Sequence, residues 1–326
     1  MICGRRVRAQ RKSALDSVRD REKRKRRIQY NPVKPPAFEY VRPSSLDEAV
    51  RLLADPAKES KVLAGGQSLI PLLNFRLAYP RRLVDIKGIA ELAYIRRDGD
   101  RLRIGATTRT RDIEESDAVA AALPLLTEAC HWVGHVQIRN RGTIGGSLAH
   151  ADPSAELPAV CVLLDAELKV RGSAGTRTAS ANGFFHGFLS TDLAPDEILE
   201  EVAFTIPAAG TRWGFREFAH RRGDFALAGA ACTLRLNRDG VVEQAVALVF
   251  GATPSPRRSA AAAAMLHGNR VTNEAIREAA QMTRRELASE PAGDSEQAYR
   301  QELCEVMLVR ALTDAVNEGA SRGVAA

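Results

Sequence analysis

Apolar and polar positions in the first part of the chain predict a small α/β unit. Short apolar runs that are typical of strands occur at 37–41, 61–64 and 82–86. Between the first two runs, the segment 44–48 (Ser-Ser-Leu-Asp-Glu) matches a capping box, and apolar residues follow it at helical spacing. Ser68 is predicted to cap a second helix that carries Pro71 in its first turn.

The pattern changes after residue 91 and predicts a mainly antiparallel α+β region. Asp98-Gly99-Asp100 separates two alternating runs and predicts a hairpin. Thr110 is predicted to cap a short helix, and Ser116 or Asp117 to open a longer helix that runs to Ala129. The apolar stretch 158–164 predicts a buried helix. Further strands are predicted at 167–170, 177–178 and 200–206.

The last third predicts a three-stranded sheet followed by three helices. The expected strands lie at 213–219, 230–236 and 241–249. The expected helices lie at 258–266, 272–288 and 295–317, where apolar residues form a stripe. We therefore predict a basic tail, two small domains, a C-terminal domain and a short tail, with boundaries at 1–35, 36–90, 91–208, 209–320 and 321–326.

Charge changes this picture only at the N-terminus. The net charge is +7, yet residues 1–34 hold 13 Lys or Arg against three acidic residues, so the rest of the chain is close to neutral. Such a block is a nucleic-acid arm or a solvated, disordered extension; we expect the extension and no nucleic acid partner, because like-charge blocks are commonly disordered. No apolar run is long enough to span a bilayer and no secretory signal is visible, so we expect a cytoplasmic protein.

The five cysteines argue against cysteine-ligated metal. None lies within four residues of another, which excludes zinc-ribbon, iron–sulfur and CxxC redox patterns. His131 and His135 have i, i+4 spacing but lack the Glu of a zinc helix, so we expect no metal site. A redox function would therefore need a cofactor of another kind.

Two glycine-containing loops carry the candidate chemistry. Residues 142–147 (Gly-Thr-Ile-Gly-Gly-Ser) and 64–69 (Ala-Gly-Gly-Gln-Ser-Leu) each combine paired glycines with hydroxyl residues. Backbone N–H groups of such turns can point inward and bind an anion. Neither loop matches a Walker A motif or the dinucleotide fingerprint. We predict that they form two halves of a site for one phosphate-bearing ligand.

Several neighbouring side chains allow two interpretations. Arg139 and Arg141 could neutralise phosphate or form surface salt bridges. Glu156 could accept hydrogen bonds from ligand hydroxyls or be an exposed residue of a turn. Phe225 could face a planar ring or belong to the core. His150 and Asp152 are expected to brace the loop by a local hydrogen bond.

At these loops the chain resembles a known family, the FAD-binding medium subunits of molybdenum hydroxylases such as carbon monoxide dehydrogenase and xanthine dehydrogenase. Four stretches in the same order carry the resemblance, which extends over residues 36–320: 38–50, 64–73, 137–153 and 222–227. It implies an α+β fold of the vanillyl-alcohol-oxidase (PCMH) type, with two FAD-binding subdomains and a C-terminal sheet with three helices.

The resemblance also implies a non-covalent FAD site. The first loop would hold the diphosphate, the second would complete that site, and other residues would lie along the adenosine, ribityl and isoalloxazine parts. The implied residues are Lys61, Ala64, Gly65, Gly66, Gln67, Ser68, Val133, Gly134, Thr143, Ile144, Gly145, Gly146, Ser147, Glu156 and Leu199. Xanthine dehydrogenases carry a Lys near the position of Glu217, so an ion pair to the cofactor is not carried over there.

The function implied is electron transfer within an oxidoreductase. Electrons would pass from [2Fe–2S] clusters on a small partner subunit through FAD to NAD, a quinone or another acceptor, while a large molybdopterin subunit oxidises the substrate. The assembly would be a dimer of heterotrimers, and this chain needs no catalytic acid or base. Two alternatives remain: a flavin-free docking subunit and a stand-alone flavin-dependent oxidoreductase.

Overall fold

The computed structural model describes residues 34–288 and 295–317. The expected tails therefore lie outside the described residues, except for residues 34 and 35. Within the described chain, residues 34–37 and 70–79 belong to one compact unit, and residues 38–69 and 80–317 form the other.

The smaller unit contains most of helix α3 (Leu69–Asn74), which begins directly after Ser68. Beyond the helix the chain turns, as the Leu77 N–H donates to the Leu72 carbonyl at 2.8 Å. Arg76 has a positive φ of 57° in this turn. The capping role of Ser68 stays a prediction.

The larger unit opens with the predicted α/β unit. Ser45 caps α2 (Leu46–Leu53) by accepting a hydrogen bond from the Glu48 N–H at 3.2 Å, and Glu48 accepts one from the Ser44 N–H at 2.8 Å. The buried face of α2 packs on Val84 and its neighbours. The sheet is parallel, in the order β1–β3–β2, with strands β1 (Glu39–Val41), β2 (Ser60–Leu63) and β3 (Arg82–Asp85).

The second sheet is antiparallel throughout, as the sequence predicts. Its five strands follow the order β4–β5–β10–β6–β7. Gly99, at the tip of the predicted hairpin, has φ +60°. The strands are β4 (Ile95–Asp98), β5 (Arg101–Gly105), β6 (Glu167–Gly172), β7 (Gly175–Ser180) and β10 (Ile198–Thr205).

Six helices accompany this sheet: α4 (Thr110–Glu114), α5 (Asp117–Ala122), α6 (Pro124–Trp132), α7 (Val136–Arg139), α8 (Ile144–His150) and α9 (Glu156–Leu163). Two predictions are wrong here. Thr110 does not cap α4, because Arg109 holds the cap position and the Thr110 hydroxyl bonds instead to the Gly142 carbonyl at 3.4 Å. The long helix to Ala129 is broken at Leu123, because the ring of Pro124 excludes helical geometry from the residue before it.

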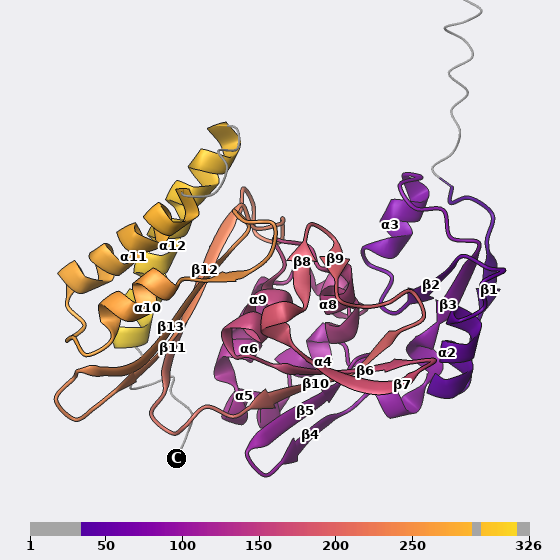
Figure 1. Cartoon of the computed structure of the whole chain (residues 1–326), viewed down its shortest axis with the longest axis horizontal. Helices are drawn as coiled ribbons and strands as arrows, with labels where there is room; N and C mark the ends of the chain where they lie inside the picture. The colour runs from indigo at the N-terminus through magenta and orange to yellow at the C-terminus, as the bar shows by residue number, and fades with distance from the viewer. Residues whose placement is uncertain (1–33, 289–294, 318–326) are drawn as a thin grey trace, which may run out of the picture. The chain divides into compact units, whose positions relative to one another are not determined.

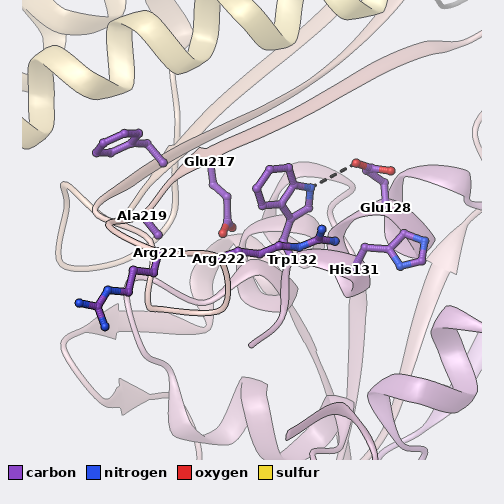
Figure 2. Close-up of a pocket in the computed structure, with 8 residues that line it drawn as sticks. Glu128, His131, Trp132, Glu217, Ala219, Arg221 and Arg222 are labelled. Carbon is purple, nitrogen blue, oxygen red and sulfur yellow. Dashed lines mark hydrogen bonds between the residues drawn. The ribbon is translucent and has the colours of Figure 1, made fainter. Parts of the chain in front are cut away.

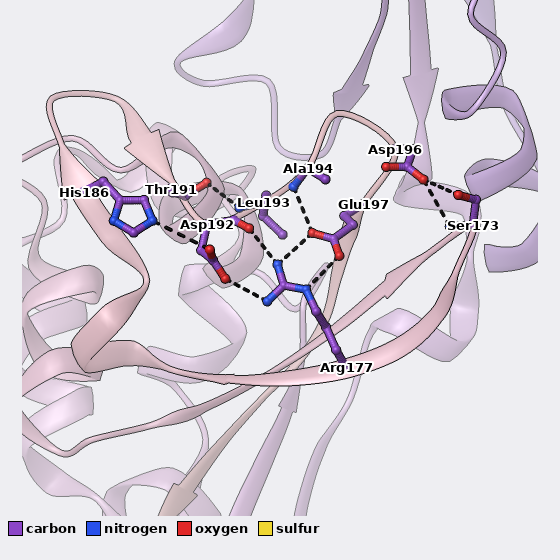
Figure 3. Close-up of polar contacts among 9 residues, drawn as sticks. All are labelled: Ser173, Arg177, His186, Thr191, Asp192, Leu193, Ala194, Asp196 and Glu197. Atoms are coloured by element: carbon purple, nitrogen blue, oxygen red, sulfur yellow. Dashed lines mark hydrogen bonds and ion pairs between the residues drawn. The ribbon is translucent and has the colours of Figure 1, made fainter.

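The sequence analysis also missed a small hairpin, β8 (Phe185–Gly187) and β9 (Ser190–Thr191). The loop that follows it is joined to β7 by Arg177, as Figure 3 shows. The guanidinium donates to both carboxylate oxygens of Glu197 at 2.7 Å and to Asp192 at 2.8 Å. Arg177 lowers the pKa of Glu197, which keeps that carboxylate ionised and places the start of β10.

The C-terminal region has four antiparallel strands in the order β11–β12–β13–β14. The predicted three strands are present, and a two-residue fourth strand is added: β11 (Arg212–Phe218), β12 (Ala228–Leu236), β13 (Val242–Phe250) and β14 (Arg257–Arg258). The three predicted helices follow as α10 (Ala260–Leu266), α11 (Asn273–Ala288) and α12 (Ser295–Asn317), on one face of this sheet (Figure 1).

Both faces of the C-terminal sheet are buried. Alternate residues of β12 face the helices α10–α12, and α12 approaches β11 so closely that a Cβ on Gly214 would lie 1.9 Å from the Ala311 carbonyl oxygen. On the opposite face, Trp213 and Phe215 join the apolar core formed with α6 and α9. The sheet is therefore shared by two cores.

Candidate functional site

The first glycine loop, residues 64–68, follows directly after β2. Gly66 has φ 75°, a conformation that glycine adopts without strain. Throughout the described chain, no residue accepts a hydrogen bond from the backbone N–H groups of residues 65–68. Gln67 closes the turn through its side chain, which donates to the Gly65 carbonyl at 3.3 Å. A row of unpaired N–H groups is suited to binding an anion.

The second loop is different, because its backbone N–H groups already have acceptors within the protein. Thr143 caps α8, and its hydroxyl accepts from the Gly146 N–H at 3.1 Å. The N–H groups of Ile144 and Gly145 donate to the carbonyls of Thr108 and Ala106 at 3.1 and 2.9 Å. The two glycines thus form the first turn of a helix, with Ser147 after them, and their donors are already used.

The two loops lie against each other, as predicted. A Cβ on Gly65 would stand 2.4 Å from the Arg141 carbonyl oxygen and 2.8 Å from Gly142 Cα. A Cβ on Gly146 would stand 3.5 Å from Ala64 Cβ. Only glycine allows this approach at residue 65, because the atoms that a side chain would meet belong to the backbone.

Lys61, an exposed residue of β2, lies near the far end of α8. Burial lowers the pKa of His150. The charge of Asp152 raises that pKa, and the charge of Lys61 lowers it further. The expected brace differs from the one observed, since Asp152 accepts from the Ser154 N–H at 2.9 Å. Arg141 is exposed.

A turn at Val133 and Gly134 links α6 to α7. Gly134 has φ 47°. The side chain of Arg139 is 12% exposed and donates to the carbonyls of Val133 and Gly134 at 3.2 and 3.1 Å. These contacts fit neither of its two interpretations, the phosphate contact and the surface salt bridge. It also pairs with Glu114 at 2.7 Å, which His131 contacts at the same distance. Arg139 therefore holds the turn in place.

The loop that carries Phe225 reaches the same turn. A Cβ on Gly223 would lie 2.3 Å from the imidazole of His135, the residue after Gly134. Phe225 is 72% exposed, so the core interpretation is wrong for it. An exposed aromatic ring beside this turn is available to stack on a planar group.

Leu199 is buried and belongs to the same core as Ile144. It lies at a register shift of β10, and the next residue, Glu200, accepts from the Ala106 N–H at 3.0 Å. Ala106 in turn accepts from Gly145. Ala106 thus links the bulge of β10 to the second loop, a role that the sequence analysis did not identify.

Glu156 is buried, so its interpretation as an exposed turn residue is wrong. It occupies the first turn of α9, where helix N–H groups favour its ionised form. Burial nevertheless raises its pKa to about 7, and the neighbouring charge of Asp152 adds to the rise.

A pocket of about 500 Å³ is lined by α6, by the end of β11 and by the residues that follow β11 (Figure 2). Trp132 and Phe218 contribute apolar surface to it, and Trp132 Nε1 donates to Glu128 at 3.2 Å. Glu217 also lines the pocket, and Arg221 and Arg222 follow it in the chain. Burial and the charge of Glu156 raise the pKa of Glu217 to about 9.

Thr107 is a second residue that the sequence did not reveal. It lies between Ala106 and Thr108, both of which accept hydrogen bonds from the second loop. Its hydroxyl is buried and forms no hydrogen bond to any described residue. A buried hydroxyl of this kind commonly has a ligand or water as its partner.

Cys130, Cys161, Cys232 and Cys304 are buried free thiols, and burial raises the pKa of each. No helix among residues 34–288 and 295–317 is both long and apolar enough to cross a membrane.

Two family models match the chain in succession. The FAD binding domain in molybdopterin dehydrogenase matches residues 36–209, and the CO dehydrogenase flavoprotein C-terminal domain matches residues 213–315. Together they cover nearly all of the described residues.

This chain matches several known proteins over almost the whole of their length. The alpha subunit of the 6-hydroxypseudooxynicotine dehydrogenase complex from Paenarthrobacter nicotinovorans is 38% identical over 87% of this chain and 96% of its own. The carbon monoxide dehydrogenase structure from Hydrogenophaga pseudoflava, which lacks the Mo-pyranopterin moiety of its cofactor, matches with a TM-score of 0.82 and 39% identity, over 86% of this chain and 98% of its own. Quinoline 2-oxidoreductase from Pseudomonas putida 86 matches with the same TM-score and 35% identity, over 88% and 99%.

The resemblance seen in the sequence is therefore confirmed, and so is the predicted fold class. The first family model describes an FAD-binding domain and the second the C-terminal domain of a flavoprotein, and the relatives are oxidoreductase subunits. The chain belongs to the family of FAD-binding medium subunits of the molybdenum hydroxylases.

Proposed function

We propose that the first loop binds the diphosphate of a non-covalently held FAD. The observation that carries this proposal is the row of unpaired N–H groups at residues 65–68, held against the backbone of Arg141 and Gly142. A diphosphate carries about two negative charges, and oriented N–H groups stabilise these without a bound cation. The buried Thr107 hydroxyl, close in the chain to the acceptors of the second loop, is a further unused polar group.

The other predicted site residues surround this cradle. Thr143 to Ser147 shape it as a helix start, with the Ser147 hydroxyl as a potential donor. We place Lys61 at the adenosine end, Glu156 at ligand hydroxyls, and Val133, Gly134 and Leu199 along the flavin, as the family resemblance implies. Arg139 acts as a positioning residue by fixing the Val133–Gly134 turn.

Within the enzyme, the chain serves electron transfer. Bound FAD supplies one-electron and two-electron redox chemistry, while the protein sets its position, polarity and access to water. The electrons come from [2Fe–2S] clusters on a small partner subunit and leave to NAD, a quinone or another acceptor. A large molybdopterin subunit oxidises the substrate, in a cytoplasmic dimer of heterotrimers. The relatives support a multi-subunit enzyme, since one is a complex subunit and another a medium chain.

Purification of the full chain together with its partner subunits tests the cofactor directly. We expect a flavin absorbance spectrum and about one FAD per chain. A complex without flavin would instead identify the chain as a docking subunit. Turnover of a small molecule by the isolated chain would identify a stand-alone flavin oxidoreductase.

A matched pair of variants locates the site. Gly66→Ala and Gly99→Ala both place a side chain at a positive φ, 75° and 60°, so their backbone cost is similar, on the order of 1–2 kcal/mol. Gly99 lies at a hairpin tip with open space around it. We expect Gly66→Ala to lose most of its FAD and Gly99→Ala to keep it. Equal FAD content in the two variants would contradict the assignment of the first loop.

A further inference from the structure

Glu217 is an acidic residue on an apolar sheet face. Side chains alternate along β11, so Glu217 points to the same side as Phe215 and Trp213, whose rings lie in the core with α6 and α9. Arg216 points to the other side and pairs with Asp314 of α12 at 2.5 Å. Glu217 is only 9% exposed.

Among residues 34–288 and 295–317, no cation forms an ion pair with this buried carboxyl. Its Oε2 atom is buried and has no hydrogen-bond partner in the described chain. Arg221 and Arg222 line the same pocket, yet neither forms an ion pair with Glu217 among the described residues, and Arg221 points away from it in Figure 2. The remaining titratable groups of the pocket are Glu128, which accepts from Trp132, and His131, which contacts Glu114.

The charged residue that acts on the pKa of Glu217 is itself acidic. Glu156, also buried, raises the pKa of Glu217 by its charge, in addition to burial. Two buried carboxylates that repel each other share one proton rather than both ionising. Glu156 sits at a helix N-terminus that favours its charged form, whereas Glu217 lies on a strand and has no such donor. The proton therefore resides on Glu217.

We propose that Glu217 is a neutral carboxylic acid under physiological conditions and serves as the proton donor of the flavin site. This inference rests on the proposed binding of FAD. When FAD is bound and two electrons arrive from the partner's iron–sulfur clusters, Glu217 would pass its O–H proton to the reduced flavin and would become a carboxylate. It then takes a proton from water through the pocket, which removes the repulsion with Glu156. On reoxidation, the two electrons go to the acceptor and the proton returns to solvent.

Infrared spectroscopy of the flavin-free full chain tests the protonation state. We expect the carbonyl band of a protonated carboxyl group at pH 8, where Glu156 with its lower pKa is mostly ionised, the loss of this band as the pH rises through about 9, and its absence at pH 8 in Glu217→Gln. Glu243→Gln is a matched control, because Glu243 lies on the same sheet but is exposed and paired with Arg235 at 3.0 Å. A wild-type spectrum without this band at pH 8 would overturn the inference, whether or not the chain binds FAD.

The flavin midpoint potential of the assembled complex tests the coupling. Above pH 9 the oxidised state starts to lose the Glu217 proton. The negative charge of a reduced flavin would hold that proton on Glu217, so reduction would take up one additional proton. The slope of potential against pH should then steepen by about 30 mV per tenfold change in proton activity for a two-electron couple. Glu217→Gln should bind FAD, because an amide resembles the neutral acid in shape, and should lack this steeper region. Identical slopes in the two proteins would disprove the coupling.

Thermal unfolding gives a third readout that needs no cofactor. Glu217 binds its proton more tightly in the folded chain than in the unfolded chain, where the ordinary pKa is 4.5. Its contribution to the free energy of unfolding is fully present below pH 4.5 and is lost as the pH rises through about 9. Glu217→Gln should therefore lose Tm less steeply than wild type between pH 5 and 9. A pH dependence that the substitution leaves unchanged would contradict a protonated Glu217.

Discussion

The two glycine loops look alike as sequences and differ as structures. In the first loop, the N–H groups of residues 65–68 have no acceptor in the part of the chain that the structure describes. In the second, residues 144–146 donate to two carbonyls and to the Thr143 hydroxyl. A backbone N–H that the protein leaves unpaired is available to a ligand, and one that it satisfies builds the scaffold.

This difference assigns the loops separate tasks. Changes in the first loop should act mainly on the bound cofactor, and changes in the second should act mainly on folding. The contact between Gly65 and the Arg141–Gly142 backbone is the one place where both effects meet.

Gly65→Ala should have the largest effect. Its Cβ would stand 2.4 Å from the Arg141 carbonyl oxygen, and backbone atoms cannot move aside as a side chain can. We expect the free energy of unfolding to fall by roughly 1–3 kcal/mol and FAD to be lost. Gly183→Ala is the control, since its Cβ would meet nothing within 4 Å. Thermal unfolding together with the FAD-to-protein ratio measures both effects. A stable Gly65→Ala chain that binds a full complement of FAD would show that the loops can separate.

Thr143→Ala should come next and act on stability. It removes the cap of α8, which costs about 1 kcal/mol on average. Thr143→Ser keeps the hydroxyl and should retain most of that energy. Chemical denaturation of the three proteins provides the comparison. If Ala and Ser variants unfold alike, the hydroxyl does not act as a cap.

Gly146→Ala should reveal a coupling between cap and glycine. Its Cβ would lie 2.8 Å from Thr143 Oγ1, and this clash offsets a helix-propensity gain of roughly 1 kcal/mol. In the Thr143→Ala background the clash is gone, so the same substitution should become stabilising. A double-mutant cycle measures the coupling, and additive effects would argue against the contact.

Ser68→Ala should have the smallest effect on folding. Ser68 is partly buried, and we expect a change below about 0.5 kcal/mol. If its hydroxyl binds the diphosphate, however, the FAD dissociation constant should rise about tenfold, the loss of one hydrogen bond to a charged group. Fluorescence titration of the apoprotein with FAD tests this. A large loss of stability without a change in affinity would reverse the assignment of tasks.

Elements with strong local signals could be predicted from the sequence. The Gly99 hairpin and the helices α10 to α12 are set by turn chemistry and apolar spacing, and they lie where expected. The helix through Ala129 failed because its apolar pattern continues across the break, while Pro124 acts on the backbone of Leu123.

The site was predictable at the level of loops and less so at the level of atoms. Family resemblance and paired glycines brought residues 64–68 and 143–147 together, and the structure places them in contact. The sequence could not show that Ala106 and Thr108 satisfy the second loop, because these bonds join residues far apart in the chain. The burial of Glu156 and Glu217 likewise depends on packing between α9 and the C-terminal sheet.

The C-terminal sheet, buried on both faces, joins the two parts of the chain that separate family models match. The two family models divide the chain between residues 209 and 213, as if two parts had been joined there. The apolar core ignores that boundary, since Trp213, Phe215 and Phe250 from the second part lie among residues of α6 and α9 from the first. Excising either part would expose this apolar surface to water, so each part depends on the other for its stability.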